Sequence, residues 1–150
     1  MHQLVQKILQ IEEEISLPRY NREDQIEPFL KWLKEKGIEI NNLEIKKFGE
    51  LGLGLCAVKD LAQSDQLIVV PENAMISENT ARNSYLGSLI KRDPILQHMG
   101  NISLSLHVLG EYANSQSTWQ PYLRILPLSY DTTLYFTPEQ VHGLKGSPAL

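Results

Sequence analysis

The first forty residues carry apolar side chains at helical spacing. A first helix is predicted where they recur every three or four positions, at Leu4, Ile8, Ile11 and Ile15. Pro18 ends this helix. After Asn21, a good capping residue, a second helix is predicted up to Gly37, with an apolar stripe at Ile26, Phe29, Leu30 and Leu33. Because proline is poorly tolerated beyond a first helical turn, Pro28 places the expected start near Glu27.

From Ile38 the apolar period changes from that of a helix to two, which is typical of strands. Three strands are predicted, with the sequences LEIKKF, LCAV and QLIVVP (43–48, 55–58 and 66–71). Parallel neighbours need a long crossover connection, and these strands follow one another too closely for that. The sequence therefore predicts antiparallel pairing among the three.

Helical spacing returns after Pro71 and is longest from Pro94 onward, at Ile95, Met99, Ile102, Leu106, Leu109 and Ala113. Gly100 lies inside this segment and costs roughly 1 kcal/mol relative to alanine in a helix, so two shorter helices remain an alternative. A further short helix is predicted within 119–126. The order of helices, a small antiparallel unit and more helices indicates an α+β fold.

The last predicted helix begins at Thr137-Pro138-Glu139-Gln140, which offers an N-cap, a proline at the first helical position and Gln at the third. Gly143 and Gly146 end it. Ser147-Pro148 is then typical of the start of yet another helix. From this pattern we expect the chain to be part of a longer protein.

Composition excludes few classes of function. The chain has 150 residues, a net charge of −4 and a pI of about 5.6, which argues against a general nucleic-acid binder. No apolar run approaches the ~20 residues that span a bilayer. The single cysteine, Cys56, is expected to pack as a small hydrophobe and suits an intracellular compartment. His98 and His107 are nine residues apart, and no metal-binding set is predicted.

The stretch GELGLGL (49–55) has three glycines that alternate with leucines. It matches neither a P-loop nor a dinucleotide-binding fingerprint, and a strand follows it where both motifs require a helix. Two interpretations stay open: a hairpin with a bulge or bend, or a place where a ligand contacts bare backbone. The role of Arg22 also stays open: its side chain is either solvated or binds a carboxylate.

An aromatic concentration follows the long helical segment, at Trp119, Tyr122, Tyr130, Tyr135 and Phe136. It is typical of core packing, and a recognition groove is the alternative. Physical reasoning from the residues does not by itself select a reaction.

Four stretches, taken in order, resemble a known family. They are NREDQIEPFLKWLKEKG, GELGLGLCAVKDLAQSDQLIVVPENAMIS, DPILQHMGNISLSLHVLGEY and WQPYLRILPLSYDTTLYFTPEQVHGLKGSPA. They are similar to the N-terminal half of SET-domain protein methyltransferases of the Rubisco-methyltransferase-like subclass. Within it, they most resemble the members that methylate a histidine of actin.

The resemblance implies a domain plan. Residues 1–40 would form an N-terminal helical segment, 41–77 the first half of a β-rich SET domain, and 78–150 part of a helical insert. It also implies S-adenosylmethionine as methyl donor. Arg22 matches an arginine that contacts this cofactor, and Leu51, Gly52 and Leu53 match the loop whose backbone holds it. Leu51 replaces an acidic residue that is usual in the family, so a side-chain contact there is not expected.

The resemblance places further family residues outside this chain. They are an Asn-His motif that closes the cofactor pocket and a tyrosine that orients the target nitrogen. No catalytic residue is assigned here, and we expect these 150 residues alone to be inactive. For the whole protein we expect a monomeric protein-histidine methyltransferase of actin in the cytoplasm, with the nucleus as a second location. The alternatives are a SET-domain lysine methyltransferase and a short, non-catalytic binding module.

Overall fold

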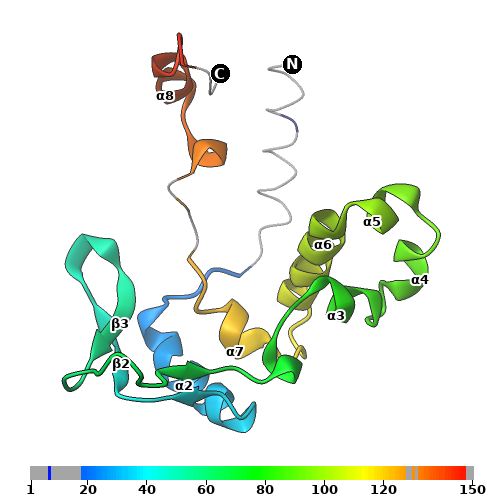
Figure 1. Cartoon of the computed structure of the whole chain (residues 1–150). Coiled ribbons are helices and arrows are strands. Elements are labelled where there is room, and N and C mark those ends of the chain that lie inside the picture. The colour runs from blue at the N-terminus through cyan, green and yellow to red at the C-terminus, as the bar shows by residue number, and fades with distance from the viewer. Residues whose placement is uncertain (1–6, 8–17, 128–129, 131, 148–150) are drawn as a thin grey trace.

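The computed structural model describes residues 7, 18–127, 130 and 132–147. The first predicted helix therefore lies outside the described residues, Lys7 aside, and so does Pro148. Figure 1 shows the β hairpin on one side of the molecule and helices α3 to α6 on the other. Helices α2 and α7 lie between them.

Helix α2 (Ile26–Glu35) begins one residue earlier than predicted, behind a short 3-10 turn, η1 (Glu23–Gln25). Pro28 is tolerated because it is the third helical residue, where a backbone N–H would have no intrahelical acceptor. The predicted stop is confirmed: Gly37 has φ +71, the left-handed conformation that favours glycine.

The buried face of α2 agrees with the predicted stripe at Leu33 and Phe29 but not at Leu30. Trp32 and Leu33 are buried, whereas Leu30, which the stripe included, is 38% exposed. Trp32 faces α7 (Gln120–Leu123), and its Nε1 donates to the Thr118 carbonyl at 2.7 Å. The partner helix thus decides which side of α2 is covered.

The strands form two separate antiparallel ladders, where a single three-stranded unit was predicted. In one ladder β2 (Leu43–Lys47) pairs with β3 (Leu53–Ala57). In the other β1 (Glu39–Ile40) pairs with β4 (Ile68–Val69), across the whole hairpin between them. The third predicted strand was therefore right in place and direction but wrong in partner.

Five short helical elements follow the strands: η3 (Glu72–Ala74), α3 (Glu78–Arg82), α4 (Gly87–Ile90), α5 (Pro94–His98) and α6 (Gly100–Ala113). The long predicted segment therefore forms two helices, the alternative that Gly100 suggested. Met99, with φ −115 and ψ 77, separates α5 from α6. Helices α3 and α4 approach so closely that a Cβ on Gly87 would lie 2.3 Å from the Arg82 carbonyl oxygen.

The predicted apolar face of α5 and α6 was wrong. Ile95 and Leu109 are 60% and 54% exposed, and the buried residues of α6 are Ser103 and His107. Helix α6 packs on its neighbours through small residues, and the Ser103 hydroxyl donates to the Leu96 carbonyl at 2.7 Å. A satisfied serine can be buried at such a close contact, where a leucine would be too large.

The chain ends in η4 (Thr133–Tyr135) and α8 (Pro138–Gly143), which Figure 1 shows apart from the other helices. The predicted capping box is confirmed: Thr137 accepts from the Gln140 N–H, and the Gln140 side chain accepts from the Thr137 N–H at 2.8 Å. The predicted stop after Gly143 is also seen.

The buried side chains form two clusters. One joins α2 and α7 and contains Trp32, Leu33, Ile38 and Ala74, with Phe29, Ile40, Trp119 and Tyr122 against it. The other lies among α3 to α6, around Ala81, Ile90 and Leu96. Mixed helices and short strands confirm the α+β class. The boundaries at residues 40 and 77 stay predictions.

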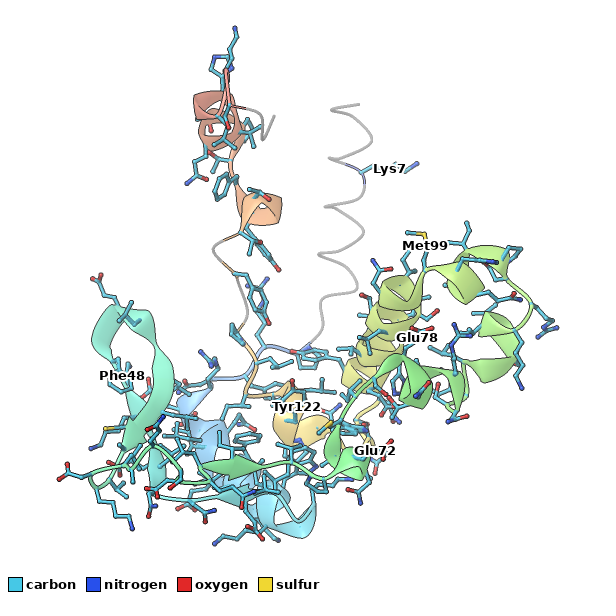
Figure 2. The ribbon with its side chains drawn as sticks, viewed as in Figure 1. Lys7, Phe48, Glu72, Glu78, Met99 and Tyr122 are labelled. Atoms are coloured by element: carbon cyan, nitrogen blue, oxygen red, sulfur yellow. The ribbon has the colours of Figure 1, made fainter. Side chains whose placement is uncertain are left out.

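The aromatic residues after α6 are explained by core packing only in part. Trp119 and Tyr122 belong to the core: Tyr122, which is labelled in Figure 2, lies against Trp32 with ring centroids 5.9 Å apart. Tyr130 and Tyr135 are exposed and contact each other at 6.0 Å. Core packing therefore explains only the first part of the concentration.

Candidate cofactor-binding site

A hollow of about 310 Å³ lies where the segment before α2 meets the β2–β3 hairpin. We call it the Arg22 hollow, and it is lined by Tyr20, Asn21, Arg22, Glu23, Lys47, Gly52 and Leu53. Three of the four cofactor residues predicted from the sequence, Arg22, Gly52 and Leu53, thus come together in one place. Arg22 and Gly52 are thirty residues apart in the chain.

The glycine stretch forms the corner of the hairpin, as one of its two interpretations predicted. A 3-10 turn, η2 (Gly49–Leu51), leads into Gly52, and the Phe48 N–H donates to the Gly52 carbonyl at 2.8 Å. Gly52 has φ 79 and ψ −148, a conformation that belongs essentially to glycine. Its missing side chain leaves bare backbone at the wall of the hollow.

Gly54 has a different role in the same stretch. A Cβ there would lie 3.0 Å from the ring of Phe48, whose side chain lies on the hairpin (Figure 2). Gly54 therefore lets the aromatic ring lie close on the first residues of β3. The glycines serve hairpin geometry and backbone exposure together.

Arg22 is half-buried and held at one nitrogen only. Its Nε donates to the Ile125 carbonyl oxygen at 2.6 Å. Among the described residues, neither terminal nitrogen of Arg22 has a protein acceptor, and Nη1 lies 3.7 Å from where a Gly52 Cβ would be. The guanidinium therefore keeps two parallel donors for an anion, the arrangement that recognises a carboxylate.

Comparisons with known proteins bear on this geometry. The chain is 41% identical over 129 residues to the actin-histidine N-methyltransferases of Papio anubis and Mus musculus, covering 86% of this chain. Among solved structures, Rubisco LSMT bound to sinefungin and monomethyllysine matches with a TM-score of 0.68 and 28% identity, over 80% of this chain and 27% of that one. The SET domain of LSMT bound to methyl-lysine and AdoHcy matches with a TM-score of 0.69 and 29% identity, over 82% and 28%.

The chain is thus similar in sequence to part of the actin-histidine N-methyltransferases and in fold to part of the SET-domain methyltransferases. It spans 22% of the length of the curated relatives it matches, and it carries a corresponding part of the SET-domain methyltransferase fold. No family model matches the chain. The matches to curated relatives and to solved structures confirm the resemblance that the ordered motifs indicated.

Leu51, the fourth predicted cofactor residue, is not among the residues that line the hollow. Its side chain is 90% exposed at the tip of the hairpin. Its N–H already donates to the Phe48 carbonyl at 3.0 Å. A cofactor contact through Leu51 stays a prediction, and with its N–H engaged the carbonyl is the backbone group that can make one.

Sequence reasoning missed four lining residues: Tyr20, Asn21, Glu23 and Lys47. The first three flank Arg22, so their proximity in the sequence was an available signal. Lys47 reaches the hollow because it pairs with Leu53 in the β2–β3 register and forms an ion pair with Glu23. Both partners are about half exposed, so the pair shapes the rim more than it stabilises the fold.

The remaining candidate residues lie elsewhere. His107 is buried in α6, where its Nδ1 has no hydrogen-bond partner and lies 3.8 Å from Glu111 Oε1. Within the described residues no three His, Cys, Asp or Glu side chains group around a possible metal position. Cys56 is only half-buried, less packed than predicted, with its Sγ 3.5 Å from the Ala57 carbonyl. None of the described helices is long and apolar enough to cross a membrane.

Proposed function

We propose that this chain forms the part of a protein-histidine methyltransferase that holds the amino-acid end of S-adenosylmethionine. The observation that carries the proposal is the unpaired fork of Arg22 beside the bare backbone of Gly52. Similarity supports it: related proteins are named actin-histidine N-methyltransferase, and one matching structure is Rubisco LSMT bound to AdoMet.

The residues present fit one end of this cofactor. The two terminal nitrogens of Arg22 would donate to the α-carboxylate, and Glu23, at the rim, carries the opposite charge to an α-ammonium group. Gly52 allows a ligand to approach the backbone, and half-buried Leu53 adds an apolar wall. When bound, S-adenosylmethionine supplies an electrophilic methyl group.

For methyl transfer the protein must mainly position the two reactants and control the protonation state of the acceptor nitrogen. The acceptor nitrogen must be held in line with the methyl group and kept unprotonated and poorly solvated. The Arg22 hollow contributes the first requirement by fixing the cofactor's end. We propose that the acceptor is a histidine of actin, on the strength of the relatives' name.

The test uses the natural protein that carries this chain, with isotopically labelled S-adenosylmethionine and purified actin. We expect label on wild-type actin and none on actin whose target histidine is replaced by alanine. Arg22→Ala should remove most of the transfer at low cofactor concentration. Equal transfer by the Arg22→Ala protein, or no cofactor binding by the wild type, would refute the proposal.

A lysine acceptor is the second candidate, favoured by the matches to LSMT structures bound to lysine and methyl-lysine. The same experiment separates the two. Label that persists on actin lacking the histidine, and that mass spectrometry places on lysine, would support the lysine methyltransferase.

We further propose that the protein acts as a monomer in the cytoplasm and the nucleus. The single cysteine, which has no partner for a disulfide within the chain, suits a reducing compartment. Cell fractionation and light scattering of the purified protein test the two statements separately.

A further inference from the structure

We propose that Arg124 is a positioning residue for the Arg22 hollow, acting through Tyr20 and Arg22 without touching the cofactor. Two consecutive residues after α7, Arg124 and Ile125, hold two alternate residues before α2, Tyr20 and Arg22. The inference rests on the proposed function, because it names what sets the affinity of that same site.

The Ile125 carbonyl fixes the plane of the Arg22 guanidinium. It accepts from Nε at 2.6 Å, across 103 positions of the chain, and Ile125 itself is only 8% exposed. A guanidinium is planar, so a hydrogen bond at Nε also sets the direction of both terminal nitrogens. Nη1 thereby lies 3.7 Å from the position of a Cβ at Gly52 before any ligand arrives.

Arg124 holds the neighbouring wall of the hollow. Its guanidinium carbon lies 4.5 Å from the centroid of the Tyr20 ring, a cation–π contact. Tyr20 lines the hollow, whereas Arg124 is not among the lining residues. The stacked pair therefore restrains the segment from Tyr20 to Arg22 at one end, while the Ile125 carbonyl restrains it at the other.

Gln120 connects this pair to the long helix α6. It is 7% exposed, and its Oε1 accepts from Arg124 Nε at 3.0 Å. Its Nε2 lies 3.1, 3.1 and 2.7 Å from the carbonyl oxygens of Glu111, Tyr112 and Asn114 near the end of α6, and its two N–H donors are shared among these three acceptors. The buried Gln120 amide thus ties Arg124 to the end of α6. This restrains the Arg124 guanidinium in its contact with Tyr20.

The consequence concerns how the site is prepared for its ligand. An arginine that is already oriented loses less side-chain freedom on binding than a solvated one. The α6–α7 segment, which the resemblance places in a helical insert, would thus contribute to cofactor affinity from outside the hollow. Loss of Arg124 should weaken binding and leave the transfer step at saturating cofactor unchanged.

The test compares Arg124→Ala and Arg124→Lys with a matched control, Lys36→Ala. Lys36 also makes cation–π contacts, with Nζ 5.3 Å from the Trp119 ring and 5.9 Å from the Trp32 ring, but it lines no part of the hollow. Calorimetric titration of the natural protein with S-adenosylmethionine should show about 5- to 10-fold weaker binding for Arg124→Ala. Arg124→Lys should recover part of the loss, and Lys36→Ala should bind as the wild type does.

Kinetics and a double variant distinguish positioning from general damage. With Arg124→Ala the KM for S-adenosylmethionine should rise by the same factor while kcat stays constant. Because Tyr20 also lines the hollow, Tyr20→Leu alone should weaken binding at least as much as Arg124→Ala, and the double variant should lose less than the sum of the two single losses, since both changes break one contact. Binding unchanged by Arg124→Ala, or equal losses for Lys36→Ala at the same Tm, would overturn the inference.

A spectroscopic readout keeps the inference testable without the cofactor. The Nε–H of Arg22 should give a slowly exchanging signal in nitrogen-15 arginine spectra, and Arg124→Ala should speed its exchange. If the wild type binds no S-adenosylmethionine, the proposed function fails, and this signal alone decides whether Arg124 orients Arg22. Equal exchange in both proteins would reject the positioning role.

Discussion

Nη1 of Arg22 lies 3.7 Å from the position that a Cβ atom would occupy at Gly52. The guanidinium and the hairpin backbone therefore face one another with no side chain between them. A ligand in the Arg22 hollow can contact a charged fork on one side and peptide groups on the other. A guanidinium opposite exposed backbone suits the amino-acid end of a cofactor, which carries a carboxylate.

Gly52→Ala should destabilise the hairpin by about 1–3 kcal/mol, because φ 79 with ψ −148 is strained for any residue with a Cβ. The free energy of unfolding from urea titration measures this. Gly143→Ala is the control, since a Cβ there meets nothing within 4 Å and no left-handed φ is needed. A control loss as large as that at Gly52 would contradict the explanation.

Arg22→Lys should weaken S-adenosylmethionine binding by about 10- to 100-fold while leaving the fold intact. Lysine keeps the charge but loses the fork and the Nε hydrogen bond to Ile125. Arg92→Lys is matched to it, because Arg92 Nε also donates to a carbonyl, that of Ser88 at 3.1 Å, away from the hollow. Calorimetry should show wild-type affinity for that control; a similar loss there would point to a general charge effect.

Gln120→Leu should cost about 2–4 kcal/mol of stability, since it removes the buried amide that partners the part-buried carbonyls at the end of α6 and the Nε of Arg124. Gln97→Leu replaces an exposed glutamine that donates to one carbonyl, and should cost under about 1 kcal/mol. Thermal unfolding of both variants gives the comparison. Equal shifts in Tm would show that burial of the amide is unimportant.

The last helix should lose order in acid. Hydrogen bonds from its own backbone N–H and from Thr137 lower the pKa of Glu139 below its ordinary value. A carboxylate with a lowered folded pKa stabilises the fold above its unfolded pKa, about 4.3, and loses that effect as the pH falls through the folded value. Amide shifts of α8 should therefore change below about pH 4.3 in the wild type. In Glu139→Gln they should be independent of pH over that range; a transition that survives there would assign it to another group.

Features that depend on a few neighbouring residues could be predicted from the sequence. The Thr137–Gln140 capping box and the stop at Gly37 are confirmed, because caps and left-handed glycines act within four positions. The hairpin corner at Gly52 was one of two interpretations for the same reason. The family resemblance then selected Gly52 and Arg22 together, which no local rule could do.

Features that depend on long-range contacts could not be predicted in this way. The pairing of β4 with β1 and the burial of Ser103 follow from which elements meet in space. Lys47 reaches the hollow through strand register, and Ile125 reaches Arg22 across 103 positions. Amphipathic spacing reports an apolar face but not whether a neighbour covers it, so the face of α6 was assigned wrongly.

The close approach of α3 and α4 has an evolutionary consequence. The Arg82 carbonyl occupies the space where a side chain at Gly87 would start, and backbone cannot move aside as a flexible side chain can. Every single-base change of a glycine codon that alters the residue introduces a Cβ. In homologous chains with this turn, position 87 should therefore stay glycine under purifying selection, while position 143, which faces open space, should drift freely.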